Sequence, residues 1–291
     1  MLLMRTLLFV PANRENMVEK AHGLDADVIV LDLEDSVPPG EKDAARGRLR
    51  DAIASLKAAG KTVHVRLNHL DTGLTRDDLA AAIGPGLDGL AFPKTEGAFQ
   101  VRELDVLIRE QEVRKSLHPG DIVLIPHIET ARGLLRCEDI ALASTRIAGL
   151  GFGAEDYTSD LGVVRTRDGN ELDYARRVIV HTAIAYGLQP LDGIFPDFKD
   201  PEGVAAEARY VRSIGMKGKY LIHPDQIAPV NEAFQPSADE VEAARKVVAA
   251  FDEAVERGHA SVQVEGRMVD TPVAKRARDL IAYVEAISAR A

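Results

Sequence analysis

Eight short apolar segments recur along the chain, and most are followed by a stretch rich in Ala, Leu, Glu and Arg. The segments cover residues 5–11, 27–35, 62–68, 89–95, 121–129, 146–153, 189–196 and 218–224. Several are nearly continuous apolar runs, which is typical of parallel strands that are covered by helices. Residues 41–60 and 96–116, between such segments, have a helical composition, and Gly or Pro marks most junctions. This alternation predicts a parallel α/β fold.

Eight β/α units over roughly 230 residues fit a TIM (β/α)8 barrel, which typically contains about 250 residues. A doubly wound open sheet is the structural alternative. The residues after the first segment, VPANRENM, lack the glycines that a dinucleotide-binding turn needs, which disfavours the open sheet without excluding it. We therefore predict an α/β protein with a TIM-barrel catalytic domain over residues 1–235.

The pattern changes near residue 235, and residues 236–291 exceed what a barrel requires. Pro236 and Ser237 open a segment with the pattern of a capped helix. Residues 261–270 predict a hairpin with its turn near Glu265 and Gly266. The last segment predicts a helix with Pro272 at its start. We expect residues 236–291 to form a helical and hairpin extension.

Composition excludes several classes of protein. The net charge of −10 argues against a nucleic-acid-binding surface, which needs an excess of basic residues. Cys137 is the only cysteine, so no intrachain disulfide forms. The apolar N-terminus is interrupted by Arg5 and ends at Pro11, which favours a first strand over a signal peptide. No segment approaches the roughly 20 apolar residues of a membrane span, so we expect a cytoplasmic protein without a membrane partner.

Polar residues gather where the predicted strands end, the place where TIM barrels carry their chemistry. These residues are Asp32, Glu34, Asp35, Arg66, Asn68, Lys94, His127, Glu129, Glu155, Asp156 and His223. Carboxylates that converge on one face repel one another unless they are protonated or share a cation. Glu129 and Asp156, from adjacent strands, are well placed to share one, and oxygen ligands with added water suit Mg²⁺. Arg66 faces the same opening and is a candidate clamp for a substrate carboxylate.

Structural roles remain open for the same residues. Strand-end acids also cap helices or pair with basic neighbours, and Arg66 is also a candidate structural ion-pair partner. We expect His127 and His223 to be buried, hydrogen-bonded residues and not metal ligands. The glycines of GFG (151–153) are expected to let the backbone approach a bound ligand. Cys137 is expected to be an inert filler in a helix.

Seven segments together resemble the citrate lyase beta-subunit-like (CitE-like) family of the HpcH/HpaI aldolase superfamily, which includes malyl-CoA and citramalyl-CoA lyases. They are RTLLFVPANRENMVEKA, DVIVLDLEDSVPPGEKDAAR, VRLN, LIPHIETARGLL, GLGFGAEDYTSDLGVVRT, KGKYLIHPDQIAPVNEAFQPS and EGRMVDTPVAKRA. They occur in order from Arg5 to about Ala277, so the resemblance covers nearly the whole chain.

The resemblance implies a TIM barrel that assembles as a homotrimer or as a hexamer of two trimers. It implies one Mg²⁺ held by Glu129 and Asp156, with Arg66 and Glu129 in contact with the substrate. It also implies a catalytic Asp in the extension that acts in the neighbouring subunit, and the GRMVDTP match places this residue at Asp270. Asp270 is equally expected to cap the final helix, and the two roles are compatible.

The implied chemistry is reversible Claisen cleavage of a carboxylated 3-hydroxyacyl-CoA to acetyl-CoA and a small 2-oxo acid. In the synthetic direction Asp270 would remove the α-proton of acetyl-CoA, while Mg²⁺ and Arg66 would stabilise the alkoxide. Glu34 and Asp35 are candidates to hold the waters of the metal. The metal assignment requires Glu129 and Asp156 to point toward each other, with no lysine or arginine head group between them.

Three alternatives remain open. One is a citrate lyase beta subunit that acts on a citryl thioester of a carrier protein. Another is a malyl-CoA thioesterase, which would release free CoA without a 2-oxo acid. A non-catalytic subunit that only binds acyl-CoA is the third, and the presence of Arg66, Glu129 and Asp156 together disfavours it.

Overall fold

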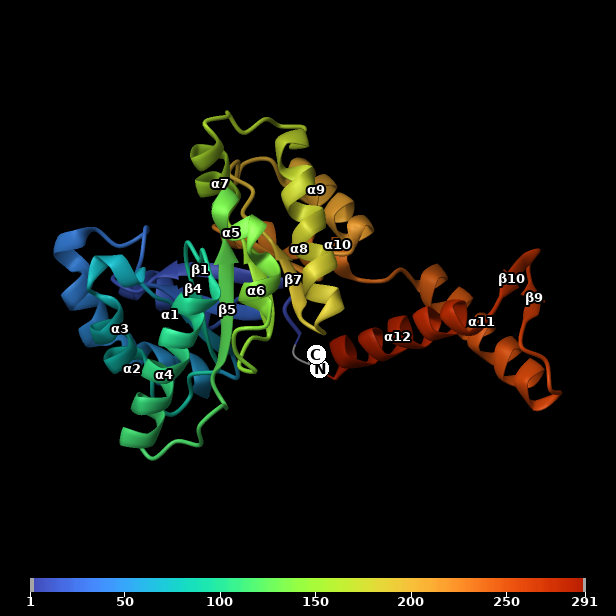
Figure 1. The fold of residues 1–291 in the computed structure, drawn as a ribbon, viewed down its shortest axis with the longest axis horizontal. Helices are drawn as coiled ribbons and strands as arrows, with labels where there is room; N and C mark the ends of the chain where they lie inside the picture. The colour runs from blue at the N-terminus through green and yellow to red at the C-terminus, as the bar shows by residue number, and fades with distance from the viewer. Residues whose placement is uncertain (1–2, 290–291) are drawn as a thin grey trace. The chain divides into compact units, whose positions relative to one another are not determined.

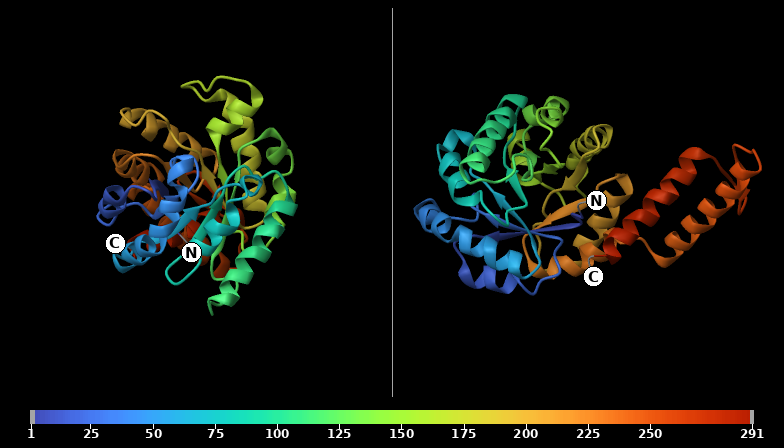
Figure 2. Two further views of the ribbon diagram at one scale, coloured as in Figure 1. Left: turned by 90° about the vertical axis from the view of Figure 1, so that its left-hand side faces the viewer. Right: turned by 90° about the horizontal axis from the view of Figure 1, so that it is seen from below.

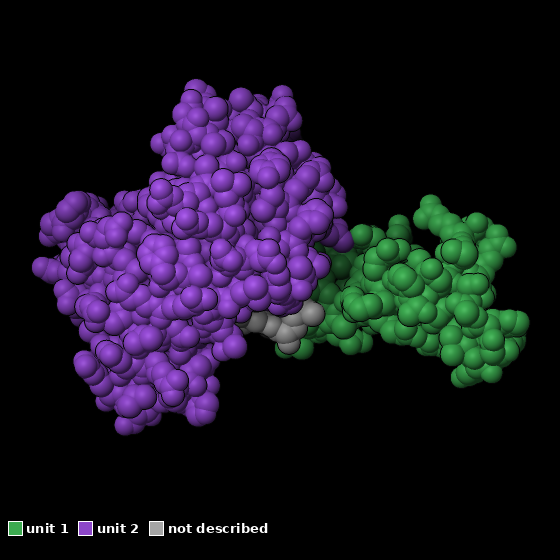
Figure 3. All heavy atoms as spheres, viewed as in Figure 1, with its two compact units in different colours: residues 1–3, 232–291 green, residues 4–231 purple. Residues whose placement is uncertain are grey.

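The chain forms two compact units in the computed structural model, which describes residues 3–289. We call residues 4–231, which are purple and keyed as unit 2 in Figure 3, the first unit, and we call the residues from Glu232 onward together with Leu3, which are keyed as unit 1, the second unit. Each unit has its own secondary structure, and all the predicted strand-end residues belong to the first.

Eight parallel strands close into a barrel in the first unit, which confirms the predicted TIM barrel and excludes the open sheet (Figure 1). The strands are β1 (Thr6–Pro11), β2 (Val28–Asp32), β3 (Thr62–Arg66), β4 (Gly89–Phe92), β5 (Val123–Ile128), β6 (Gly149–Phe152), β7 (Gln189–Asp192) and β8 (Gly218–Leu221). The barrel closes where β1 pairs with β8, with Leu7 opposite Tyr220 and Leu8 opposite Leu221. Because the strands are parallel, their carboxyl ends meet at one end of the barrel.

Helices surround the barrel strands, as Figure 2 shows. They are α1 (Glu15–Ala21), α2 (Lys42–Ala58), α3 (Thr75–Ala82), α4 (Ala98–Arg114), α5 (Ala131–Leu135), α6 (Cys137–Ala141), α7 (Ala154–Leu161), α8 (Asp173–Ala185), α9 (Pro201–Ile214) and α10 (Ile227–Phe234). Short 3-10 turns occupy Pro39–Glu41, Leu70–Thr72, Asn170–Leu172 and Pro224–Gln226. Every residue of β2, β4, β6 and β8 is buried. Burial on both faces explains why these strands are continuous apolar runs in the sequence.

The second unit contains α11 (Ala238–Glu256), β9 (Val262–Val264), β10 (Arg267–Val269) and α12 (Thr271–Ser288). Ser237 caps α11 through a capping box with Glu240, as expected from the Pro-Ser start. Glu265 and Gly266 form the hairpin turn with φ angles of 48° and 79°, which fits the left-handed turn that hairpins favour. Pro272 lies in the first turn of α12, so the three elements predicted for the extension are confirmed.

A small apolar cluster stabilises the second unit from within. Phe251 of α11, Val269 of β10 and Ala274 of α12 are buried together, and neighbouring valines pack against them. Among the described residues, no helix combines the length and apolar character that a bilayer crossing needs. The cytoplasmic location stays a prediction.

Candidate active site

A cavity of about 340 Å³ opens at the carboxyl ends of the barrel strands. Its lining joins polar groups to an apolar wall and comprises Phe9, Asp32, Asp35, Ser36, Arg66, His127, Glu129, Phe152, Gly153, Ala154, Glu155, Asp156, Ile194, Tyr220 and Ile222. Most of the predicted strand-end residues therefore do line one cavity. An apolar wall with a few converging charges is the usual composition of a small-molecule site.

Glu129 lies directly after β5 and is almost fully buried, with 2% of its surface exposed. Its Oε2 accepts a hydrogen bond from the peptide N–H of Lys94 at 3.0 Å, and Oε1 lies 3.3 Å from Nδ1 of His127. The other nitrogen of His127 lies 2.8 Å from the hydroxyl of Tyr220. Burial by itself raises the pKa of Glu129, but His127, Lys94 and Arg66 together bring it below its ordinary value. The side chain is thus a fixed carboxylate.

Asp156 lies in the first turn of α7, directly after β6. Burial and the neighbouring charge of Glu129 raise the pKa of Asp156 above its ordinary value. The preceding residue, Glu155, pairs with Arg165, which also donates to the carbonyl of Ile194 at 2.8 Å. This contact anchors the start of α7, so the backbone that carries Asp156 is held in place.

Glu129 and Asp156 converge on one positive charge, which is the ammonium of Lys94. Its Nζ lies 3.9 Å from Oε2 of Glu129 and 3.5 Å from Oδ1 of Asp156. The same Nζ donates to Oε1 of Glu34 at 2.7 Å and lies 3.8 Å from Oδ2 of Asp35. The first half of the condition set on the metal assignment is met, because both carboxylates approach one position, but the second half fails, because a lysine head group lies within 4 Å of both.

Lys94 is the residue whose role the sequence did not reveal, although it was recognised at a strand end. It directly follows Pro93 after β4, and its φ of 47° is left-handed, which is unusual for a residue with a side chain. No local pattern in GLAFPKT identifies that conformation. Strain of this kind persists only where the surroundings enforce it, and it concentrates at functional sites.

Arg66, at the end of β3, is bound to Asp32. Its Nε and one Nη each donate to a different oxygen of Asp32 at 2.7 Å, and its guanidinium lies over the ring of Phe9 at 4.3 Å. The remaining Nη lies 3.0 Å from Oε2 of Glu34. We expected Arg66 to make a two-pronged contact with a substrate carboxylate, but it makes this contact with Asp32. The alternative role of Arg66 as a structural ion-pair partner is therefore present. A substrate contact through the remaining Nη stays a prediction.

Burial and these charges set the protonation states of Asp32 and Glu34. Burial raises the pKa of Asp32, but Arg66 outweighs it and lowers the pKa to about 2. Glu34 is also buried, and burial, opposed by Arg66 and reinforced by Glu129, raises its pKa to about 7. Oε2 of Glu34 is buried and has no hydrogen-bond partner among the described residues, despite its closeness to Arg66.

The charge balance of the cavity favours a further cation. Apart from Glu155, which pairs with Arg165, five carboxylates lie in or beside the cavity, those of Asp32, Glu34, Asp35, Glu129 and Asp156, together with two basic groups, Arg66 and Lys94. Full ionisation leaves a net charge of −3, and protonation of Glu34, whose pKa is about 7, leaves −2. Oxygen donors suit a hard cation such as Mg²⁺. No group of three or more acidic, His or Cys side chains in residues 3–289 forms a complete metal cage. Proteins commonly bind Mg²⁺ through one or two carboxylates, with water or substrate oxygens in the remaining coordination positions. The pair of Glu129 and Asp156 therefore fits this ion.

The remaining candidates divide between confirmed and wrong predictions. His127 is buried and hydrogen-bonded as expected, whereas His223 is only half-buried, although it stacks on Phe198 and accepts from the backbone N–H of Asp225. His223 is half-buried where it begins the Pro224–Gln226 turn after β8. Cys137 is buried at the start of α6, as expected of a filler in a helix, and burial raises its pKa to about 11, which disfavours the reactive thiolate.

Two glycines of GFG make room for side chains of the site. A Cβ on Gly151 would meet the ring of His127 at 2.4 Å, and a Cβ on Gly153 would meet Cγ of Glu129 at 2.3 Å. Gly153 also lines the cavity, and the expected approach of the backbone to a ligand stays a prediction.

Asp270 belongs to the second unit and is the N-cap of α12. Its side chain accepts from the backbone N–H of Val273 at 3.3 Å. The capping role predicted for it is thus present, and its catalytic role stays a prediction.

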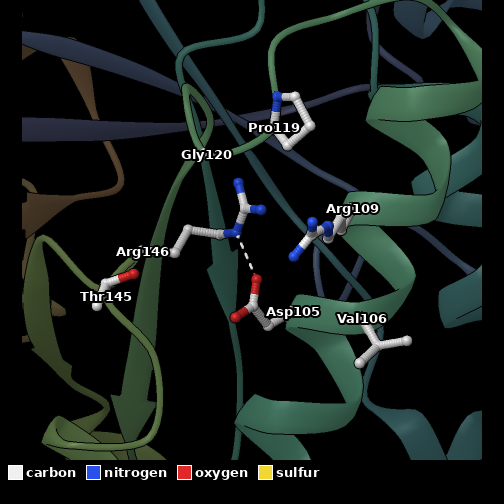
Figure 4. A pocket seen from close by; sticks show the side chains of 7 residues that line it. All are labelled: Asp105, Val106, Arg109, Pro119, Gly120, Thr145 and Arg146. Carbon is white, nitrogen blue, oxygen red and sulfur yellow. Dashed lines mark hydrogen bonds and ion pairs between the residues drawn. The ribbon is translucent and has the colours of Figure 1, made fainter.

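A second cavity, of about 260 Å³, lies beside the amino ends of β5 and β6, away from the strand ends that carry Glu129 and Asp156 (Figure 4). Arg146 in its lining pairs with Asp105 at 2.9 Å and with Glu112 at 2.8 Å. The guanidinium of Arg146 is thus paired with two carboxylates. Residues at the amino-terminal end of a TIM barrel typically contribute to stability, so we assign this cavity no catalytic role.

Comparison with known proteins places this geometry in a family. The family model described as HpcH/HpaI aldolase/citrate lyase matches residues 5–224. The chain belongs to this family. It is 38% identical over 284 residues to the citrate lyase subunit beta of Leuconostoc mesenteroides subsp. cremoris, covering 98% of the chain and 94% of the relative. It is 37% identical over 306 residues to an L-malyl-CoA/beta-methylmalyl-CoA lyase of Cereibacter sphaeroides, covering 98% and 96%.

A solved structure of the same family resembles the chain over nearly its whole length. It is the CitE protein of Mycobacterium tuberculosis in complex with magnesium, acetoacetate and coenzyme A. The TM-score is 0.77 at 32% sequence identity, and the match covers 97% of this chain and 98% of that one. The match therefore includes the extension, which lies beyond the residues that the family model covers.

Proposed function

We propose that the chain is a Mg²⁺-dependent carbon–carbon lyase that cleaves, or forms by Claisen condensation, a carboxylated 3-hydroxyacyl-CoA. Malyl-CoA and citramalyl-CoA are the substrates we favour, with acetyl-CoA and a 2-oxo acid as products. The observation that carries the proposal is the convergence of Glu129 and Asp156 on one cation position in the cavity. The Mycobacterium tuberculosis relative, whose structure contains magnesium and coenzyme A, supports the same ligands.

Glu129 and Asp156 would hold the metal, which supplies a Lewis acid for the oxygens of the substrate. The peptide N–H of Lys94 and the ring of His127 fix the orientation of Glu129 before any ligand arrives. Glu34 and Asp35 are placed to hold water beside these groups. The apolar wall of Phe9, Phe152, Ile194 and Ile222 excludes bulk water and so strengthens the electrostatic contacts.

Proton transfer is assigned to Asp270 of a neighbouring copy of the chain. In cleavage, the hydroxyl proton passes to solvent, the carbon–carbon bond breaks, and its electron pair moves to the α-carbon of the thioester. Asp270, which has taken a proton from solvent, then gives it to that carbon, which yields acetyl-CoA. In condensation, the same carboxylate removes this proton. The arrangement requires a homotrimer or a hexamer, which light scattering of the purified protein will test.

The decisive experiment incubates the purified chain and Mg²⁺ with malyl-CoA, citramalyl-CoA and citryl-CoA, and measures 2-oxo acid, acetyl-CoA and free CoA separately. We expect acetyl-CoA and 2-oxo acid in equal amounts. Glu129→Gln and Asp156→Asn should each reduce turnover at least about 100-fold, the size of effect expected when a group that positions transition-state charge is removed. Glu110→Gln, on the exposed face of α4, is the matched control and should retain full activity.

Two results would contradict the proposal. Full activity of either cavity variant would refute the metal assignment. Free CoA without 2-oxo acid would instead indicate a thioesterase.

A citrate lyase beta subunit is the second candidate, and the 38% identity to the Leuconostoc mesenteroides protein favours it. Such a subunit would act on a citryl thioester of a carrier protein. Turnover of free CoA thioesters by the isolated chain counts against this candidate. Turnover only with a citryl-loaded carrier protein would establish it.

A further inference from the structure

Lys94 contributes two different groups to the candidate site, and they act on the same carboxylate. Its peptide N–H donates to Oε2 of Glu129 at 3.0 Å, and its ammonium lies 3.9 Å from that oxygen. The peptide contact depends on the left-handed φ of 47°, so the backbone conformation is part of the site. Of the three non-glycine residues in the described chain with positive φ, Ser116 and Glu265 lie in a loop and a hairpin turn.

The Lys94 ammonium is placed as a counter-ion to a group of acids. It donates to Glu34 at 2.7 Å and lies within 4 Å of Asp35, Glu129 and Asp156. A lysine side chain is protonated at neutral pH, so this ammonium brings a positive charge to the four acids.

We propose that Lys94 is a built-in cation of the site that competes with a divalent metal for Glu129 and Asp156. This inference rests on the proposed function, in which these two carboxylates hold Mg²⁺. The ammonium lies within 4 Å of an oxygen of each carboxylate, so a metal bound to both must compete with its charge. Lys94 is thereby a positioning residue that sets the affinity for the metal and offsets the repulsion between the two carboxylates when no metal is bound.

The surroundings provide a place for the displaced ammonium. Its side chain is 33% exposed, in contrast to the 3% of Glu129, and its four-carbon stem is flexible. Glu34 already accepts a hydrogen bond from Nζ at 2.7 Å, and Asp35 lies 3.8 Å from it, so these two carboxylates would hold the ammonium if a metal took Glu129 and Asp156. Arg66 is not a comparable competitor, because Asp32 engages two of its nitrogens. Removal of the Lys94 charge should therefore strengthen metal binding.

The test measures binding of Mg²⁺ and Mn²⁺ to the chelator-treated full chain by isothermal titration calorimetry. Lys94→Met removes the charge, and Lys94→Gly removes it while suiting the left-handed backbone, so at least one variant should fold. We expect both to bind the ions at least tenfold more tightly than the unmodified chain. Lys94→Arg, which restores a positive charge, should bring the affinity back toward the original value. Lys61→Met is the matched control, since Nζ of Lys61 donates only to the carbonyl of Leu24, and should change nothing.

The direction of the change separates this proposal from a purely structural role. Loss of a merely structural lysine would weaken metal binding or leave it unchanged, and either result in a folded variant overturns the inference while the proposed metal site stands. If the Lys94 variants bind the ions and the unmodified chain does not, the inference is supported, because the lysine then prevents measurable metal binding. Absence of binding in both the unmodified chain and the variants would overturn the inference and the proposed metal site together.

Discussion

The peptide N–H of Lys94 and Oε2 of Glu129 are joined by a hydrogen bond of 3.0 Å that links the end of β4 to the end of β5. The bond forms because Lys94 adopts a left-handed backbone conformation, with φ at 47°. A side chain in this region costs roughly 1–2 kcal/mol relative to the right-handed region. Glycine does not incur this cost.

Lys94→Gly should accordingly be more stable than Lys94→Ala, by about 1 kcal/mol. Both variants lose the ammonium and keep the peptide N–H, so the difference reports the backbone alone. The measurement is the urea midpoint of unfolding. The control is Arg48, which is exposed to solvent in the middle of helix α2. There Arg48→Ala should be more stable than Arg48→Gly by about 1 kcal/mol. Greater stability of Lys94→Ala would contradict the left-handed conformation.

Asp270 has two predicted roles that a set of substitutions separates. Its side chain caps α12 through Val273, and we propose that it transfers the α-proton in a neighbouring subunit. Asp270→Asn and Asp270→Ser keep a capping oxygen, whereas Asp270→Ala loses it at a cost of about 1 kcal/mol. All three should abolish deuterium exchange at the α-carbon of acetyl-CoA, followed by mass spectrometry. Undiminished exchange in Asp270→Ser would assign the base to another residue.

Arg66 is tested together with Asp32, because the two are joined by two hydrogen bonds in a buried place. Arg66→Met leaves the Asp32 carboxylate without its partner and should cost about 3 kcal/mol of unfolding free energy, as for other broken buried pairs. Adding Asp32→Asn should restore much of the stability. Activity then decides the role: kcat/KM stays low in the stable double variant if Arg66 contacts the substrate, and recovers if Arg66 is only structural.

The barrel and the extension were predictable from the sequence because their signals are local and repeated. Buried parallel strands such as Val28–Asp32 require continuous apolar runs, and helix starts such as Ser237 and Pro272 require particular residue types. Parallel strands also bring their carboxyl ends together, which is why Glu129 and Asp156 were correctly expected to share a cavity.

The pairing of side chains within the cavity was not predictable in the same way. Asp32 and Lys94 belong to different strands, and which acid each base contacts depends on side-chain conformations that no sequence spacing encodes. The Arg66 fork was therefore expected at the substrate and is found at Asp32. Position 94 has a left-handed backbone conformation, which normally occurs at Gly or Asn, but the residue there is a lysine. His223 was expected to be buried, yet it is only half-buried at the start of the turn after β8.

His64 on β3 predicts an acid sensitivity of the barrel. It is fully buried, and neither ring nitrogen has a hydrogen-bond partner among the described residues. Its ring occupies space that a side chain on Gly89 would need, since a Cβ there would lie 2.7 Å from Nε2. Burial lowers the pKa of His64 from 6.5 to about 4, while Asp88 opposes the shift only weakly. The neutral ring is therefore the form that the folded barrel accommodates.

Stability should fall as the pH decreases from 6.5 to about 4, because in this range the unfolded chain binds a proton at His64 and the folded chain does not. The loss from this residue amounts to about 3 kcal/mol at most, at about 1.4 kcal/mol per pKa unit. His64→Leu removes the proton site and should flatten the pH dependence of the urea midpoint between pH 7 and pH 4.5. His118→Leu, at an exposed position, should retain the slope of the unmodified chain. An equal slope in His64→Leu would show that the ring is protonated or solvated in the folded barrel.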